Sequence, residues 1–141
     1  MKLQYVGVLM LCLMVIFIIY YFLNKDGDDH IIVKEDTLRA IQSLIDKNPI
    51  LIVSKTHCPY GKQSYITFTH ACKVPKDMIK VIQLDEMKYG SELQKGLFQM
   101  NGQRTVPHIY INHKFIGGND DLQDLKNKGK LKALVQEALK E

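Results

Sequence analysis

The run Ile50 to Ser54, ILIVS, constrains the fold of this chain more than any other feature. It is a short apolar stretch rich in β-branched residues, with a proline directly before it and polar residues after it. Such a run is typical of a strand buried on both faces, and a strand of this kind needs helices above and below its sheet. The sequence therefore predicts an α/β fold around this strand.

Helical and strand patterns alternate on both sides of this run. Leu38, Ile41, Leu44 and Ile45 recur three and four residues apart, which predicts a helix with one apolar face before the strand, ended by Asn48-Pro49. A βαβ unit followed by a hairpin and a helix predicts a mixed sheet with helices on both faces. The elements expected after the first strand are a helix from Cys58, a strand over 80–84, a helix over 91–100, hairpin strands over 108–111 and 114–116, and helices from about Asp120 and Lys130.

The segment from Tyr5 to Leu23 carries no charged residue. Its length of about 19 residues is close to that of a bilayer-spanning helix. It also lacks the small residues of a signal-peptide cleavage site. We therefore expect one transmembrane signal anchor over 1–23, with 5–23 in the membrane, a polar connector over 24–30 and a folded domain over 31–141.

The charges that flank this segment predict its orientation. Lys2 precedes it, whereas Asp26, Asp28 and Asp29 outweigh Lys25 just after it. Positive charge tends to remain on the cytoplasmic side. The expected localisation is a single-pass type II membrane protein of the endoplasmic reticulum or Golgi, with the domain in the lumen.

The charge and cysteine content exclude some classes of function. The formal net charge is +4, and the lysines are spread over several segments, which argues against nucleic acid as a partner and favours a small anionic ligand. Three cysteines, Cys12, Cys58 and Cys72, do not form the framework of a small disulfide-rich secreted protein.

Cys58 is the first candidate for chemistry. It stands directly before Pro59, at the predicted start of a helix, where free amide hydrogens and the helix dipole favour a thiolate. Lys55 adds positive charge three residues upstream. Read from this segment alone, the sequence favours Cys58 as a small buried apolar residue over a catalytic thiol.

The segment Thr105-Val106-Pro107 is the second candidate. A proline that opens a strand indicates a fixed peptide bond, which a cis bond would satisfy. The backbone of Val106 would then be available to pair with an extended peptide ligand. An ordinary proline of an edge strand explains the same residues.

The third candidate is Gly117-Gly118-Asn119-Asp120-Asp121. Its glycines allow close backbone approach, and the helix start beyond them can bind a carboxylate through its amide hydrogens. Asp121 could then hold an ammonium group. A glycine turn capped by Asn119 or Asp120 is the alternative interpretation.

Taken together and in this order, the three segments resemble the glutaredoxins of the thioredoxin-like superfamily, in particular the yeast type. The resemblance covers roughly residues 31–141. It rests on Lys55-x-x-Cys58-Pro59-Tyr60, on Asn101-Gly102-Gln103-Arg104-Thr105-Val106-Pro107, and on Gly117-Gly118-Asn119-Asp120-Asp121-Leu122.

The resemblance implies a thioredoxin-like fold with a four-stranded mixed sheet, and Cys58 as the catalytic residue. It also implies that glutathione is the co-substrate. Lys55 and Gln94 would hold its glycyl carboxylate, and Val106, beside a cis Pro107, would pair with its cysteinyl backbone. The amides of Asp120 and Asp121, with the Asp121 side chain, would bind its γ-glutamyl end. The residues expected to bind glutathione are Lys55, Tyr60, Gln94, Thr105, Val106, Pro107, Gly118, Asp120 and Asp121.

Gly61 departs from the dithiol members of this family, which carry a second cysteine at this position. Cys72 cannot replace it, since 14 residues along a helix span about 21 Å. We therefore predict a monothiol enzyme that removes glutathione from protein thiols, or installs it, through Cys58. Its partners would be glutathione and glutathionylated proteins, and it would act as a monomer.

Two alternatives remain open. The chain could instead form a dimer that holds a [2Fe-2S] cluster through Cys58 and one glutathione per subunit, or it could be a redox-like adaptor with an unreactive Cys58. No other metal site is predicted, because His57 and His108 alone do not supply enough ligands beside Cys58. A protonated His108 near Cys58 is a further hypothesis, since it would favour the thiolate.

Overall fold

The computed structural model describes residues 2–25 and 33–140. The chain divides into two compact units, Met1–Ile32 and Val33–Glu141. The first unit contains one helix, α1 (Lys2–Lys25), whose side chains from Tyr5 to Tyr21 are exposed. The predicted connector over 24–30 falls mainly on residues outside the described ranges.

The predicted membrane anchor is not supported. Among the helices of the described residues, none combines the length and the apolar character needed to cross a membrane. The anchor over 1–23, the membrane contact through 5–23 and the lumenal type II placement in the endoplasmic reticulum or Golgi are therefore wrong. The prediction rested on an uncharged run of about 19 residues, whereas a bilayer crossing also requires sufficient apolar character along one helix.

The second unit is built on a four-stranded mixed sheet, as predicted, in the order β2-β1-β3-β4. The strands are β1 (Ile50–Ser54), β2 (Ile79–Gln83), β3 (His108–Ile111) and β4 (Lys114–Gly117). β1 pairs in parallel with β2 and antiparallel with β3, which pairs antiparallel with β4. All five residues of β1 are buried, in agreement with its expected central place.

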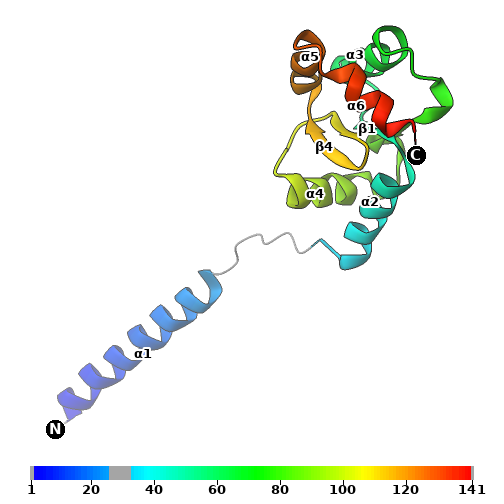
Figure 1. Ribbon diagram of the computed structural model, residues 1–141. Coiled ribbons are helices and arrows are strands. Elements are labelled where there is room, and N and C mark those ends of the chain that lie inside the picture. The colour runs from blue at the N-terminus through cyan, green and yellow to red at the C-terminus, as the bar shows by residue number, and fades with distance from the viewer. Residues whose placement is uncertain (1, 26–32, 141) are drawn as a thin grey trace. The chain divides into compact units, whose positions relative to one another are not determined.

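Helices cover both faces of this sheet (Figure 1). Ile50 and Ile52 point from β1 into one apolar cluster, and Leu51 and Val53 point into the other, because successive side chains of a strand alternate. The elements are α2 (Glu35–Lys47) and α4 (Gly90–Asn101) on the Leu51 side, and α3 (Pro59–Ile66), α5 (Asn119–Asn127) and α6 (Leu131–Ala138) on the Ile50 side.

Three short helical turns complete the unit. The helix predicted from Cys58 leaves α-helical geometry after Ile66 and continues as a π-helical segment, η1 (Thr67–Ala71). Two 3₁₀ turns, η2 (Lys76–Met78) and η3 (Leu84–Glu86), flank β2. These turns place the loops after β1 and β2 side by side at one end of the sheet, where the Asp85 carboxylate accepts the backbone amide of Thr56.

Candidate active site

Cys58 lies at the amino-terminal end of α3, as predicted. It is the N-cap residue, with extended backbone angles, and Pro59 follows in the first turn. Its amide donates to the carbonyl oxygen of Lys55 at 3.0 Å, which closes the turn between β1 and α3. The half-buried thiol therefore stands beside the unpaired amide hydrogens of a helix start.

The carboxylate of Asp85, in η3, holds this turn. It accepts hydrogen bonds from the backbone amide of Thr56 at 2.9 Å and from the Thr56 hydroxyl, and lies 3.2 Å from Nε2 of His57. The Thr56 side chain is the main cause of a lowered pKa of Asp85. Asp85 thus restrains the two residues that precede Cys58, a role that the sequence did not indicate.

Position 61 brings no second thiol to this site. Gly61 is buried, and a Cβ atom there would lie 2.0 Å from Oγ of Ser54. Cys72 follows η1, packs against the apolar cluster, and has Lys126 and Lys132 as its charged neighbours. Burial raises the pKa of the Cys72 thiol. Neither Cys58 nor Cys72 forms a disulfide.

A pocket of about 430 Å³ lies beside α3. It contains seven of the nine residues predicted to bind glutathione, and also Gln103 and Asn119, which were not predicted. The peptide bond between Val106 and Pro107 is cis, as predicted. The Cys58 thiol lies 3.8 Å from the carbonyl oxygen of Val106, at the wall of this pocket. The lining residues are Tyr60, Gln103, Thr105, Val106, Pro107, Gly118, Asn119, Asp120 and Asp121.

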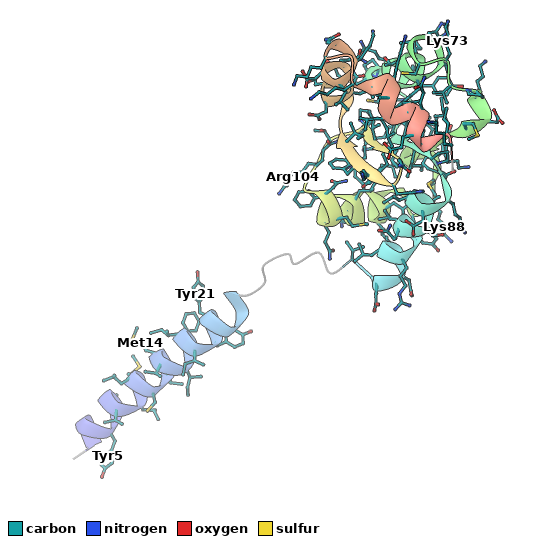
Figure 2. The ribbon with its side chains drawn as sticks, in the orientation of Figure 1. Tyr5, Met14, Tyr21, Lys73, Lys88 and Arg104 are labelled. Atoms are coloured by element: carbon teal, nitrogen blue, oxygen red, sulfur yellow. The ribbon has the colours of Figure 1, made fainter. Side chains whose placement is uncertain are left out.

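The other two predicted residues lie outside this lining. Lys55 lines a separate groove on the β2 side of α3. The side-chain amide of Gln94 donates to the carbonyl oxygen of Arg104 at 3.2 Å. The Arg104 guanidinium covers the Phe98 ring of α4, 4.5 Å from its centroid. Figure 2 labels Arg104 near α4.

The segment with the cis bond is held by Gln103. Its side-chain amide donates to the carbonyl oxygens of Thr105 and Pro107, both at 2.7 Å. The backbone amide of Gln103 in turn donates a hydrogen bond of 2.9 Å to Oδ1 of Asn101, which fixes the backbone of Gln103. The carbonyls of Thr105 and Pro107, on either side of Val106, are thereby occupied, and Val106 itself lines the pocket.

The opposite wall is the start of α5. Gly117 has a φ of 121° and lies directly against the side chain of Asp121. A Cβ atom at this glycine would lie only 2.1 Å from Oδ2 of Asp121. That carboxylate accepts the amide of Gly118 at 2.9 Å. Buried Asn119 links α5 to α3 by accepting from the Ser64 hydroxyl at 3.0 Å. The first amide hydrogens of α5 are thus held towards the pocket.

His108 faces the α4 side of the sheet and not the pocket. It is fully buried, and its Nδ1 accepts from the side-chain amide of Asn101 at 3.0 Å. Its Nε2 has no hydrogen-bond partner among the described residues. Desolvation lowers the pKa of His108 to about 4, so the ring is neutral at pH 7. The hypothesis of a protonated His108 beside Cys58 is therefore wrong.

Metal ligands do not gather at this site within the described ranges, where no group of three or more His, Cys, Asp or Glu side chains could hold an ion.

Comparison with known proteins shows a consistent likeness. The family model "Glutaredoxin" matches residues 50–116. Glutaredoxin-1 of Saccharomyces cerevisiae is 46% identical over 107 residues, which cover 76% of this chain and 97% of that protein. The mitochondrial glutaredoxin-2 of Homo sapiens is 42% identical over 103 residues, 71% of this chain and 58% of that protein. The crystal structure of a buckwheat glutaredoxin–glutathione complex superposes with a TM-score of 0.69 at 33% identity, over 74% of this chain and 91% of that one.

Proposed function

This chain belongs to the glutaredoxin family of glutathione-dependent thiol-disulfide oxidoreductases, and we propose that its domain, over 31–141, works by a monothiol mechanism through Cys58. The observation that carries the proposal is the place of Cys58. Its thiol lies at the start of α3 and 3.8 Å from the carbonyl oxygen of Val106, a residue that lines the 430 Å³ pocket, with Gly61 where a resolving thiol would stand.

The first step is attack by the Cys58 thiolate on the glutathione sulfur of a mixed disulfide between glutathione and a protein. The protein–glutathione S–S bond breaks, a Cys58–glutathione S–S bond forms, and the protein leaves as a thiolate that takes a proton from water. Asp85 fixes the backbone of Thr56 and contacts the side chain of His57, the two residues before the attacking cysteine.

The second step is attack by a glutathione thiolate on the glutathione sulfur bound to Cys58. This step releases glutathione disulfide and restores the Cys58 thiolate, so no second protein thiol is needed. Each step is a thiol–disulfide exchange and is reversible. The same residue can therefore remove glutathione from protein thiols or install it, according to the ratio of glutathione to its disulfide.

Glutathione is proposed to lie along the 430 Å³ pocket. The Val106 backbone, between the carbonyls held by Gln103, is suited to pair with the cysteinyl unit as an added strand. The free amides of Asp120 and Asp121 are suited to the γ-glutamyl carboxylate. The Asp121 carboxylate, which already accepts from Gly118, can add the γ-glutamyl ammonium as a second donor.

The remaining predicted contacts have unequal support. Tyr60, Thr105 and Gly118 line the same pocket. Lys55, in the turn before Cys58, would reach the glycyl carboxylate from outside the lining. Gln94 would have to exchange its hydrogen bond with Arg104 for one with the ligand, so its contribution is the smallest that we propose.

The test is glutathione-dependent turnover of a glutathionylated peptide by the full chain, beside Cys58→Ser and the matched variant Cys72→Ser. We expect turnover in the wild type and in Cys72→Ser, and none in Cys58→Ser. A wild type without turnover, but with visible absorbance that Cys58→Ser removes, would replace this proposal with the dimer that holds a [2Fe-2S] cluster.

A further inference from the structure

A second hollow lies on the other side of α3 from the glutathione pocket. It has a volume of about 720 Å³ and runs between α3 and the uncovered part of β2, next to the turn that precedes Cys58. Gly61 and Lys55 line its end nearest Cys58. We call it the lysine groove. Its lining shares no residue with the 430 Å³ pocket.

The lysine groove is strongly positive. Four lysines line it and no acidic residue does. Lys62, Lys76 and Lys80 are exposed, and Lys55 is half-buried. None of the four takes part in an ion pair or a side-chain hydrogen bond within the described part of the chain. Clustered cations without counter-charges raise the local positive potential and attract an anionic partner.

The surface between these lysines is apolar. Tyr65 and Ile66 of α3 form one wall, with Ile66 53% exposed, and Val81 of β2 lies opposite. β2 is also an edge strand, because it pairs only with β1 in the described sheet. A free phosphate or a small anion would use the lysines alone. A polypeptide with carboxylates and an apolar side chain would use both features.

The position of the groove indicates when such a polypeptide would bind. In the proposed function, glutathione takes the pocket on the Val106 side of Cys58, so the protein half of the mixed disulfide must lie outside that pocket. The lysine groove is the adjacent hollow that the glutathione half leaves free.

We propose that the lysine groove binds an acidic segment, with at least one apolar side chain, that flanks the glutathionylated cysteine of a protein substrate. This inference rests on the proposed function for its place in the reaction. It adds a preference among substrates that the glutathione pocket cannot provide, because glutathione is common to all of them.

The test compares two peptides of equal length around one glutathionylated cysteine. One carries Asp, Glu and a Leu, and the other replaces each acid by its amide. The protein is the full chain as wild type, as Lys62→Gln/Lys76→Gln/Lys80→Gln, and as the matched control Lys88→Gln/Lys95→Gln/Lys114→Gln, which removes the same charge from residues outside the groove. Lys55 is left intact, since it belongs to the proposed glutathione site.

We expect the wild type and the control to turn over the acidic peptide about threefold to tenfold more efficiently, in kcat/KM, than the amide peptide, from two or three exposed ion pairs. The groove variant loses this preference, and so does the wild type at high salt. Equal kcat/KM values for the two peptides in the wild type, or a preference that survives in the groove variant, would overturn the inference.

Two further measurements separate this inference from the proposed function. The mixed disulfide of glutathione and 2-mercaptoethanol has no polypeptide, so its turnover tests the monothiol reaction alone and should be equal in all three proteins. Binding of the unmodified acidic peptide, with serine for cysteine, needs no catalysis. Fluorescence anisotropy should show threefold to tenfold tighter binding than for the amide peptide, and equal affinities would overturn the groove even if no turnover were found.

Discussion

The thiol of Cys58 lies 3.8 Å from the carbonyl oxygen of Val106, although the two residues are 48 positions apart in the chain. This contact joins the start of α3 to the segment with the cis bond. The thiol and the backbone proposed to bind the cysteinyl unit of glutathione are therefore neighbours.

Gln103→Leu should weaken glutathione binding. It removes both hydrogen bonds to the carbonyls of Thr105 and Pro107 and leaves the buried Pro107 carbonyl unsatisfied, at a cost of about 1–3 kcal/mol in the free energy of unfolding. We expect KM for glutathione to rise several-fold. Gln42→Leu removes a comparable exposed hydrogen bond in α2 and should leave KM unchanged. Equal KM values in both variants would contradict a role for Gln103 in positioning Val106.

Gly117→Ala should damage the γ-glutamyl end of the pocket. The new Cβ would collide with the Asp121 carboxylate in a backbone conformation that only glycine adopts readily. Gly129 also has a positive φ, 69° against 121° for Gly117, but nothing lies within 4 Å of its Cβ, so Gly129→Ala is a control for alanine at a positive φ without a collision. Both should lose roughly 1–3 kcal/mol of unfolding free energy. Only Gly117→Ala should also raise KM for glutathione, and a normal KM would disprove the proposed place of the γ-glutamyl group.

Asp85→Asn should loosen the turn before Cys58 and lower kcat/KM. Hydrogen bonds from Thr56 lower the pKa of Asp85 below its ordinary value of 3.8. The ionised form therefore contributes stability above pH 3.8, and this contribution is lost as pH falls through the lowered pKa. Thermal unfolding should show a higher Tm for the wild type than for Asp85→Asn at pH 6. The difference in Tm between the two proteins should be smaller near pH 3. A constant difference would show that the charge of Asp85 is not involved.

His108 should influence stability and not the pH profile of catalysis. Burial lowers its pKa from 6.5 to about 4, so below pH 6.5 the unfolded chain binds a proton that the folded chain rejects. Stability should fall between pH 6.5 and 4, by up to about 3 kcal/mol. Denaturant unfolding should show that His108→Asn loses this pH-dependent part. The pH profile of kcat/KM from pH 5 to 8 should have the same shape in His108→Asn as in the wild type. An altered shape would show that His108 takes part in catalysis.

Much of the fold followed from patterns in the sequence. The buried β1, the apolar face of α2 and the hairpin of β3 and β4 each have a signal within a short window, and the mixed sheet follows from their order. The π-helical η1 had no such signal, although a bond from the Cys72 amide to the Thr67 carbonyl, five residues back, closes it. The membrane anchor was wrong because an uncharged run of suitable length does not by itself have the apolar character of a spanning helix.

The residues that support the site were harder to predict than those that line it. Glycine, proline and cysteine have special backbone or chemical properties that can be read locally. Asp85 acts on Thr56 across 29 residues, and Asn119 meets Ser64 across 55, so only the folded sheet brings them together. Gln103 was noted only as part of a family segment, and its hydrogen bonds to the backbone show what it does there.

The most direct test of the monothiol account is intact-mass spectrometry of the full chain after one equivalent of a glutathionylated peptide, before any free glutathione is added. We predict one glutathionyl group per chain, located at Cys58 by peptide mapping and removed by free glutathione. A chain that has instead lost two hydrogens through a disulfide between Cys58 and Cys72, or that remains unmodified at Cys58, would contradict the account.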